Sequence, residues 1–339
     1  MGQLIQPTKK HQLSGRDMQH KILLTRKWPT AVEDYLRSRY DVTFNTSSEP
    51  MTESELREAA SNFDVLLTTT SERLTANVFL EPHCKVRLIC NFGVGYDHID
   101  VAACRASNII VTNTPDVLTD ATAEIAIMLM LVVARRAGDG ERALRSARTT
   151  DCMPTQSLGT QVTGKTLGLV GFGRIGQATA AIAHQGLGMK ILYHARHRVD
   201  QSIENSLQAQ YCKNIDELLA NADFVSLHCP GGAATENLLD AQRLKQMKRS
   251  AFLINTSRGS VINEGALVDA LRNGIIAGAG LDVYRNEPNI HTDLLTAPNT
   301  VLLPHIGSAT AETRHAMGMR AVKNLEHWLE GRDPPDRIT

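Results

Sequence analysis

The sequence predicts an α/β protein made of two doubly wound domains, each with a parallel sheet covered by helices. Three observations support this prediction. The chain has 339 residues, which is long enough for two domains. Short apolar segments of strand length alternate with helical segments along most of it. Residues 171–176 read Gly-Phe-Gly-Arg-Ile-Gly and lie between an apolar run at 167–170 and a helical pattern at 177–183.

The first half of the chain predicts one sheet. Because strands that alternate with helices pair in parallel, we expect helices on both of its faces. A long helix is predicted to follow at 120–146, with Thr119 or Asp120 as its N-cap. The strands are predicted at 22–25, 42–44, 65–68, 88–91 and 109–112, and the helices between them at 31–39, 53–60 and 101–106.

The second half begins its own series of strands and helices at residue 167. A final helix at 311–330 ends before Gly331 and a pair of prolines. Strands are predicted at 167–170, 190–193, 224–228, 252–255, 278–283 and 301–303, and helices at 217–220, 241–247 and 264–272.

The glycine segment is the pattern that binds a dinucleotide when a strand precedes it and a helix follows. Gly171 allows the tight turn, Gly173 lets the backbone approach a pyrophosphate, and Gly176 lets the helix pack closely. The start of the helix offers free N–H groups and a partial positive charge to phosphate. The residues predicted to bind the cofactor here are Gly171, Phe172, Gly173, Arg174, Ile175 and Gly176.

These elements predict how the chain divides into domains. Residues 20–117 with 304–339 form a flavodoxin-like substrate domain, and a Rossmann nucleotide domain at 118–303 is inserted into it. Two crossings between the domains predict a hinge. Residues 1–19 are polar and basic without periodicity, so they predict a disordered extension, and Met18 is an alternative start.

Composition excludes several classes of protein. The formal net charge is zero and no apolar run reaches transmembrane length, so neither nucleic acid nor a membrane is an expected partner. No CxxC pair is present, which predicts reduced thiols in a cytoplasmic protein and no metal site. The six cysteines are Cys84, Cys90, Cys104, Cys152, Cys212 and Cys229.

The residue expected to bind the adenosine ribose is not acidic. In this fold an acidic side chain about 20 residues after the glycines binds the ribose hydroxyls. His194 occupies that position, and Arg196 and Arg198 follow it. An acid would repel a 2′-phosphate, whereas guanidinium groups bind phosphate. The pattern predicts NADP as cofactor, with NADPH preferred over NADH; a solvated basic turn is the alternative.

Three polar residues follow predicted strands in the second half: Arg258, Glu287 and His305. Open α/β sheets bind ligands at the carboxyl ends of their strands, where these residues lie. An arginine can bind a carboxylate with two parallel hydrogen bonds. A histidine beside a carboxylate can hold and deliver a proton near neutral pH. Together they predict the catalytic residues of a nicotinamide-dependent enzyme.

Further short motifs accompany the glycine motif in a fixed order: 91–100 (NFGVGYDHID), 112–115 (TNTP), 119–124 (TDATAE), 227–230 (LHCP), 255–259 (NTSRG), 280–283 (GLDV), 286–288 (NEP) and 303–307 (LPHIG). Through these stretches the chain, from about Lys21 to its end, resembles the D-isomer-specific 2-hydroxyacid dehydrogenases, and within them most closely the glyoxylate/hydroxypyruvate reductases.

The resemblance implies that a small 2-keto acid is reduced to a D-2-hydroxy acid. Arg258 would bind the carboxylate and polarise the keto oxygen, and His305 would protonate that oxygen while NADPH gives hydride to the carbon. Glu287 would hydrogen-bond His305 and keep it charged. Val94 and Gly95 would offer backbone N–H groups to the carboxylate. Implied cofactor contacts are Asp282 (to the nicotinamide carboxamide), Cys229, Pro230, Thr256 and Thr122.

Two alternatives to this function remain open. A phosphoglycerate dehydrogenase-like enzyme is one, and a nucleotide-sensing binding protein without catalysis is the other. Relatives that reduce hydroxypyruvate often carry tryptophans in the loop before the glycine motif, and here residues 149–154 have none. The sequence therefore leaves the physiological 2-keto acid and the pathway undetermined.

The helix at 120–146 predicts a homodimer. Its segment 125–134 is apolar on every side, so both faces are expected to be buried. One face would meet the sheet of its own domain and the other a second copy, as in the C2 dimers of the family. Burial within one subunit is the alternative.

Overall fold

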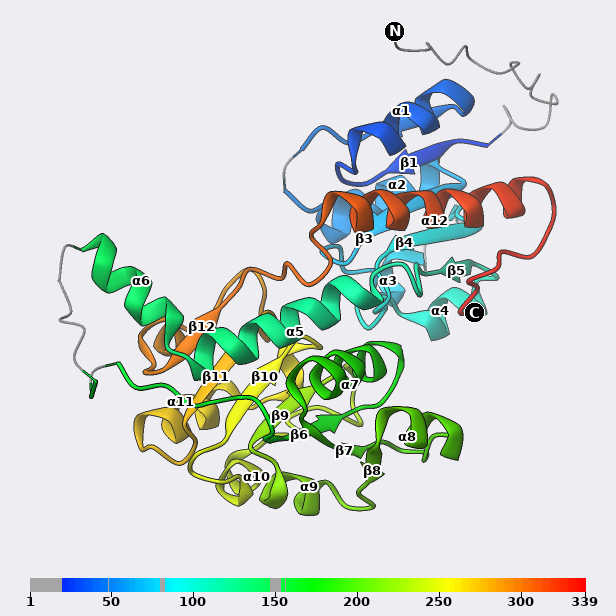
Figure 1. The fold of residues 1–339 in the computed structure, drawn as a ribbon. Coiled ribbons are helices and arrows are strands. Elements are labelled where there is room, and N and C mark those ends of the chain that lie inside the picture. The colour runs from blue at the N-terminus through cyan, green and yellow to red at the C-terminus, as the bar shows by residue number, and fades with distance from the viewer. Residues whose placement is uncertain (1–19, 48, 80–82, 147–153, 156) are drawn as a thin grey trace, which may run out of the picture. The chain divides into compact units, whose positions relative to one another are not determined.

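Two sheets of parallel strands organise the protein (Figure 1). The computed structural model describes residues 20–47, 49–79, 83–146, 154–155 and 157–339. The described chain divides into unit 1, which ends at Val117 and resumes at Ala311, and unit 2, which runs from Leu118 to Thr310. The chain thus returns to unit 1 after Thr310, whereas the sequence predicts the crossing after residue 303. The predicted extension at 1–19, with Met18, lies outside the described residues.

Among its described residues, unit 1 holds a five-stranded sheet in the order β2-β1-β3-β4-β5. Strands β1, β3 and β4 are buried along almost their whole length, as expected when helices cover both faces of a parallel sheet. The strands are β1 (Ile22–Leu24), β2 (Val42–Phe44), β3 (Val65–Thr69), β4 (Leu88–Phe92) and β5 (Ile110–Thr112), and the helices are α1 (Thr30–Arg39), α2 (Glu53–Asn62), α3 (Ala76–Phe79), α4 (Val101–Ala106) and α12 (Ala311–Leu329).

The residues that follow α12 are held against β5. The backbone N–H of Ile338 donates to the carbonyl of Val111 at 2.8 Å. Asp336 is buried and accepts two hydrogen bonds of 2.6 Å from Arg320 of α12. The tail therefore lies beside the edge strand of the sheet and shields it from solvent.

The described part of unit 2 holds a seven-stranded sheet in the order β12-β11-β10-β9-β6-β7-β8. Its strands are β6 (Thr166–Val170), β7 (Lys190–His194), β8 (Ala209–Tyr211), β9 (Phe224–Leu227), β10 (Phe252–Asn255), β11 (Gly278–Leu281) and β12 (Thr300–Leu302). Its helices are α5 (Thr119–Ala134), α6 (Ala137–Arg145), α7 (Arg174–Leu187), α8 (Gln201–Leu207), α9 (Ile215–Asn221), α10 (Ala241–Gln246) and α11 (Glu264–Arg272), with 3₁₀ turns η1 (Gly259–Val261) and η2 (Thr292–Thr296).

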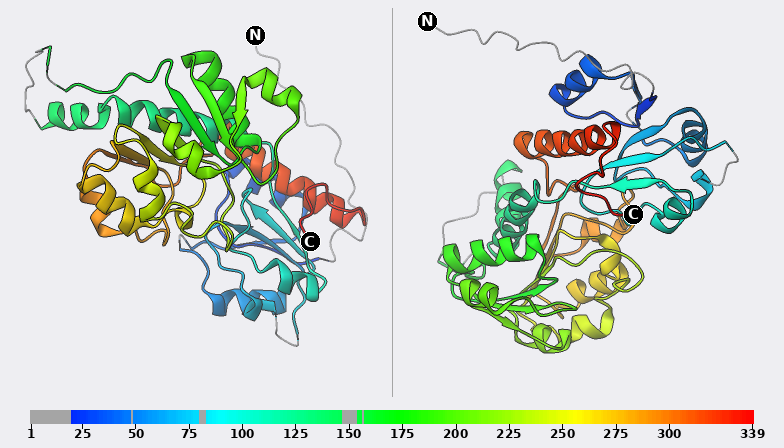
Figure 2. Two further views of the ribbon diagram at one scale, coloured as in Figure 1. Left: turned by 90° about the horizontal axis from the view of Figure 1, so that it is seen from below. Right: turned by 90° about the vertical axis from the view of Figure 1, so that its right-hand side faces the viewer.

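Helices cover both faces of the unit 2 sheet and form an apolar core on each (Figure 2). One core joins α5 and α7 to the sheet and includes Leu129 and Ala180. The other joins α9, α10 and α11 to it and includes Leu218 and Leu267. Both sheets are purely parallel, which confirms the predicted fold class.

The helix predicted at 120–146 is wrong as a single element, because the structure has two helices there. Thr160 N–H donates to the Ala134 carbonyl at 2.7 Å, where a continuing helix would need the N–H of residue 138. Arg136 then adopts a left-handed backbone, with φ of 52°. Helix α5 therefore ends at Ala134, and a second helix, α6, begins at Ala137. No residue of α6 is buried.

One further expectation about α5 needs correction. The predicted N-cap, Thr119 or Asp120, is wrong: Leu118 is the N-cap and makes no side-chain cap, and Thr119 already lies in the helix. The burial of both faces of this helix stays a prediction, because the second copy expected on one face is not part of the single chain. Met128 and Leu131 are 38% and 36% exposed, so one apolar face of α5 is open in the single chain.

The sequence analysis did not predict three short elements: α3, α8 and β8. Each is seven residues or shorter, and α8 consists mostly of polar residues. Their apolar periodicity is too brief to be recognised, because such patterns need a longer window.

Candidate active site

The glycine loop 171–176 lies at the topological switch point of the unit 2 sheet. It follows β6, whose two neighbours, β7 and β9, lead the chain toward opposite edges. Gly171 has φ of 93°, and a Cβ there would lie 2.6 Å from the backbone nitrogen of Cys229. A Cβ on Gly173 would meet nothing within 4 Å. Only glycine therefore fits at 171. At 173 the backbone borders open space, where a ligand can approach it.

The surroundings of this loop fit a dinucleotide. Helix α7 begins after Gly173 without a side-chain cap, and the start of a helix is a site where backbone N–H groups can bind phosphate. Directly after β10, the Thr256 hydroxyl is buried and has no hydrogen-bond partner among the described residues. A buried polar atom without a partner is costly, and a ligand atom would satisfy it.

The three residues predicted to recognise a 2′-phosphate follow the end of β7 and differ in their contacts. His194 Nδ1 donates to the carbonyl oxygen of Cys212 at 3.0 Å. Arg196 is exposed and makes no hydrogen bond or ion pair in the described chain. Arg198 forms an ion pair of 2.7 Å with Glu204. Two nitrogens of the Arg198 guanidinium, Nε and Nη2, therefore already bind Glu204, which its sequence position could not reveal.

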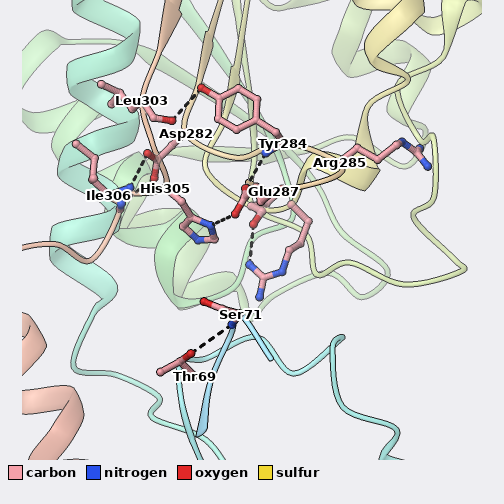
Figure 3. Close-up of polar contacts among 12 residues, drawn as sticks. Thr69, Ser71, Asp282, Tyr284, Arg285, Glu287, Leu303, His305 and Ile306 are labelled. Atoms are coloured by element: carbon pink, nitrogen blue, oxygen red, sulfur yellow. Dashed lines mark hydrogen bonds and ion pairs between the residues drawn. The ribbon is translucent and has the colours of Figure 1, made fainter. Parts of the chain in front are cut away.

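Glu287 and His305 form a hydrogen-bonded pair in unit 2 (Figure 3). His305 Nδ1 lies 2.6 Å from Glu287 Oε2. The other carboxylate oxygen, Oε1, accepts the backbone N–H of Tyr284 at 2.8 Å. Because Glu287 is held by the backbone and holds Nδ1 of the ring, Nε2 of His305 remains for chemistry on a substrate.

Asp282 holds the loop that carries His305. Its two oxygens accept the backbone N–H groups of Ile306 at 2.8 Å and Gly307 at 2.7 Å. His305 has φ of 55°, a left-handed conformation that costs energy for a residue with a side chain. The bonds from Asp282 stabilise this turn (Figure 3). Burial raises the pKa of the Asp282 carboxyl.

Arg258 is half-buried in the turn after β10. The side chain of Asn255 shapes this turn: its Nδ2 donates to the Arg258 carbonyl at 2.9 Å, and its Oδ1 accepts from Ser257 N–H at 3.0 Å. Gly259 follows, and a Cβ there would lie 1.9 Å from the carbonyl carbon of Tyr284. Glycine at 259 thus brings the turn that carries Arg258 against the turn that carries Glu287.

Two residues that the sequence analysis missed support the 284–287 turn. Glu264 is buried at the start of α11 and accepts the backbone N–H of Arg285 at 2.8 Å. The Tyr284 hydroxyl donates to the Leu303 carbonyl at 2.9 Å, which ties this turn to the strand end before His305. Neither residue belongs to a local motif, so only the fold brings them to the site.

In unit 1, the loop that contains Val94 and Gly95 has its carbonyl groups bound by asparagine side chains. Asn91 Nδ2 donates to the carbonyls of Gly93 at 3.1 Å and Gly95 at 2.9 Å. Asn113 Nδ2 donates to the carbonyl of Val94 at 2.8 Å. The N–H groups of Val94 and Gly95 bind no described residue. The loop therefore has two backbone donors that a ligand could use.

The remaining predicted cofactor residues have varied surroundings. Thr122 is buried in α5, and its hydroxyl donates to the Leu118 carbonyl at 2.9 Å. Cys229 lies against the glycine loop, and burial raises the pKa of its thiol to about 11. Pro230 is exposed beside it. The neighbouring His228 was not predicted to have a role; burial lowers its pKa to about 4, so its ring is neutral at pH 7.

In the described ranges, no group of three or more His, Cys, Asp or Glu side chains could hold a metal ion. Among the residues that the structure describes, no helix is long and apolar enough to span a membrane. Cys152 and most of the loop at 149–154, with its missing tryptophans, lie outside the described residues.

Comparison with known proteins places this geometry in a family. The sequence profile described as D-isomer specific 2-hydroxyacid dehydrogenase, NAD binding domain, matches residues 127–307. A glyoxylate reductase of Thermococcus onnurineus (strain NA1) is 42% identical over 325 residues, which cover 95% of this chain and 96% of that protein. A glycerate dehydrogenase of Hyphomicrobium methylovorum is 38% identical over 313 residues, 92% of this chain and 97% of the relative.

A solved structure gives the same match in three dimensions. The NADPH-dependent glyoxylate/hydroxypyruvate reductase of Sinorhizobium meliloti, in complex with NADP and malonate, superimposes with a TM-score of 0.81 at 32% identity. The match covers 94% of this chain and 97% of that one.

Proposed function

Because the chain belongs to the D-isomer-specific 2-hydroxyacid dehydrogenases, which are oxidoreductases of 2-hydroxy acids, we propose that it uses NADPH to reduce small 2-keto acids, glyoxylate and hydroxypyruvate among them. The observation that carries this proposal is the 2.6 Å pair of His305 and Glu287 in the unit that carries the glycine loop. The product is the D-2-hydroxy acid where the new centre is chiral. Glyoxylate reductase and glycerate dehydrogenase are the names of two relatives, and glycerate is the product of hydroxypyruvate reduction.

The side chains of unit 2 divide the work on the substrate. Bound NADPH supplies the hydride. His305 delivers the proton from Nε2 to the keto oxygen, and Glu287 orients the ring and stabilises its charged form through Nδ1. Arg258 binds the carboxylate and polarises the keto oxygen. Asp282 keeps His305 in place, because it binds the two N–H groups that follow it.

The glycine loop, the N-terminus of α7 and the turn after β7 form the cofactor site in this proposal. The glycine loop and the N-terminus of α7 would hold the phosphates of the cofactor. Arg196, which has no partner in the described chain, pairs with the 2′-phosphate. The S. meliloti relative is named NADPH-dependent, which supports the same cofactor here. Further contacts come from His194, Cys229, Pro230, Thr256, Asp282 and Thr122.

Val94 and Gly95 of unit 1 bind the substrate carboxylate with their N–H groups. The support for this role is that Asn91 and Asn113 bind all three carbonyls of Gly93, Val94 and Gly95. Because side chains bind the carbonyls of this loop, its N–H groups are the backbone groups left for an anion. Consecutive backbone donors of this kind attract anions.

The protein also forms a homodimer through α5. Met128 and Leu131 leave an apolar face of this helix exposed in the single chain, and a second copy related by a two-fold axis would cover both copies of that face. Sedimentation velocity of the wild type and of Leu131→Glu tests this. A wild type that sediments as a monomer at micromolar concentration contradicts it.

The central experiment measures initial rates over a panel of 2-keto acids with NADPH and with NADH. We expect turnover of glyoxylate and hydroxypyruvate, and D-glycerate as the product from the latter. His305→Ala should lose about 100-fold or more in kcat, the lower range for removal of a general acid. Tight NADPH binding without turnover of any 2-keto acid would identify a nucleotide-sensing protein. Formation of L-glycerate would refute the stereochemistry.

A further inference from the structure

A buried carboxylate lies beneath the turn that follows β7. The side chain of Glu204, on α8, is 4% exposed. Arg198 donates to both of its oxygens, from Nε at 2.8 Å and from Nη2 at 2.7 Å. Such a bidentate pair fixes the plane of the guanidinium. Arg198 is thus committed to a partner within its own chain.

Tyr193 ties the same carboxylate to the backbone of the turn. Its hydroxyl donates to Glu204 Oε1 at 2.5 Å and accepts the N–H of Val199 at 3.2 Å. The ring of Tyr193 is fully buried and stacks on Phe172 of the glycine loop, with ring centroids 4.1 Å apart. The hydrogen bonds from Arg198 hold the pKa of Glu204 down at about 2. The carboxylate is therefore charged at neutral pH.

The charge of the turn follows from these contacts. Arg198 and Glu204 have opposite charges in direct contact, so they nearly cancel for a ligand outside the pair. Arg196 is left as the exposed arginine of the turn without a partner among the described residues. If Arg198 were absent, the buried Glu204 carboxylate would be an uncompensated negative charge beneath the turn and would disfavour a 2′-phosphate bound there.

We propose that Arg198 supports NADPH binding by neutralising Glu204, and that it does not bind the 2′-phosphate itself. Glu204 is then a determinant of cofactor specificity that touches no part of the cofactor, and Arg198 is a positioning residue. Arg196 is the residue that pairs with the phosphate. This inference rests on the proposed preference for NADPH.

A double-mutant cycle tests the inference. The dissociation constants of NADPH and NADH are measured by fluorescence titration at low salt for the wild type, Arg198→Ala, Glu204→Gln and the double variant. Glutamine at 204 keeps an oxygen that accepts the Tyr193 hydroxyl while it removes the charge. Arg272→Ala is the matched control, because Arg272 forms an exposed ion pair of 3.0 Å with Asp293 on another part of unit 2.

We expect Arg198→Ala to weaken NADPH binding about tenfold and NADH binding by about twofold at most. The double variant should recover NADPH affinity to within about twofold of the wild type, because no net charge is left unpaired. Glu204→Gln alone should tighten NADPH binding by about threefold or more, since it releases the charge of Arg198. Arg272→Ala should change neither constant.

A double variant that stays as weak as Arg198→Ala would overturn the inference, because it would mean that Arg198 touches the phosphate. If Arg198→Ala does not fold, Glu204→Gln decides: unchanged or weaker NADPH binding overturns the inference. Equal affinity of the wild type for NADPH and NADH overturns the cofactor choice itself and this inference with it. In that case the proposed reduction of 2-keto acids would still stand, with NADH as an equally good cofactor.

Discussion

The hydrogen bond between Glu287 and His305 gives a direct prediction. Glu287→Gln keeps the shape of the side chain and an oxygen that can accept from His305 Nδ1, but it removes the negative charge. In the reduction, His305 must enter the reaction protonated. The charged ring loses its ionic partner in the variant, so the proton donor of the reduction is less stabilised.

The size of the effect can be worked from the contact. A hydrogen bond to a charged group is worth about 1.5–3 kcal/mol, and 2.6 Å is short. The side chains of His305 and Glu287 are 40% and 34% exposed, so solvent screens the pair and the lower end applies. A loss of about 1.4 kcal/mol is tenfold in rate. We therefore expect kcat/KM for reduction to fall about tenfold at neutral pH.

The assay follows NADPH consumption with glyoxylate from pH 5 to 9 for the wild type, Glu287→Gln and Glu264→Gln. Glu264 is the matched control, because it accepts from the same turn, at Arg285 N–H, but does not touch His305. In Glu287→Gln, kcat/KM should be about tenfold lower than in the wild type. Glu264→Gln should keep the wild-type rate. A wild-type rate in Glu287→Gln would refute the role of this carboxylate.

Three further perturbations test other contacts. Asp282→Asn leaves either Ile306 N–H or Gly307 N–H without its acceptor, so the free energy of unfolding should fall by about 1–3 kcal/mol, with a lower kcat; an unchanged thermal unfolding curve would contradict the anchoring role. Asn91→Ala removes two hydrogen bonds that hold the 93–95 loop, so KM for the keto acid should rise about tenfold; an equal weakening of NADPH binding would indicate general damage instead. For Glu204, the folded-state pKa of about 2 lies below the ordinary 4.5, so its pair with Arg198 stabilises the fold above pH 4.5 and is lost as the pH falls toward 2. The stability difference between wild type and Glu204→Gln, from urea unfolding, should shrink over that window, and a difference independent of pH would count against the pair.

Much of the fold could be predicted because its determinants are local. Parallel strands buried on both faces contain apolar runs, such as 65–67 (VLL) and 252–254 (FLI), and such runs are visible in the sequence. The glycine motif could be assigned because a strand precedes it and a helix follows. The break in the predicted long helix could not, because it depends on Thr160, a residue far along the chain that binds the Ala134 carbonyl.

The candidate site divides in the same way. Arg258, Glu287 and His305 stand after predicted strands, so the rule for open α/β sheets identifies them. The residues that hold them, Glu264 and Tyr284, act through tertiary hydrogen bonds and carry no local pattern. Arg198 shows that a local pattern can also mislead. Its position in the chain indicates a phosphate ligand, but folding brings Glu204 of α8 to it as a partner.

The discontinuity of unit 1 has a consequence for the order of events during synthesis. Unit 2 is one continuous segment, Leu118–Thr310, whereas unit 1 needs residues from both sides of it. Helix α12 supplies the buried Met317, Ala321 and Leu325, and the tail after it covers the edge of β5. On the ribosome, unit 2 therefore has all of its sequence before unit 1 does, and the earlier-made β1–β5 region waits for the last segment to leave the exit tunnel. The domain that is begun first is completed last.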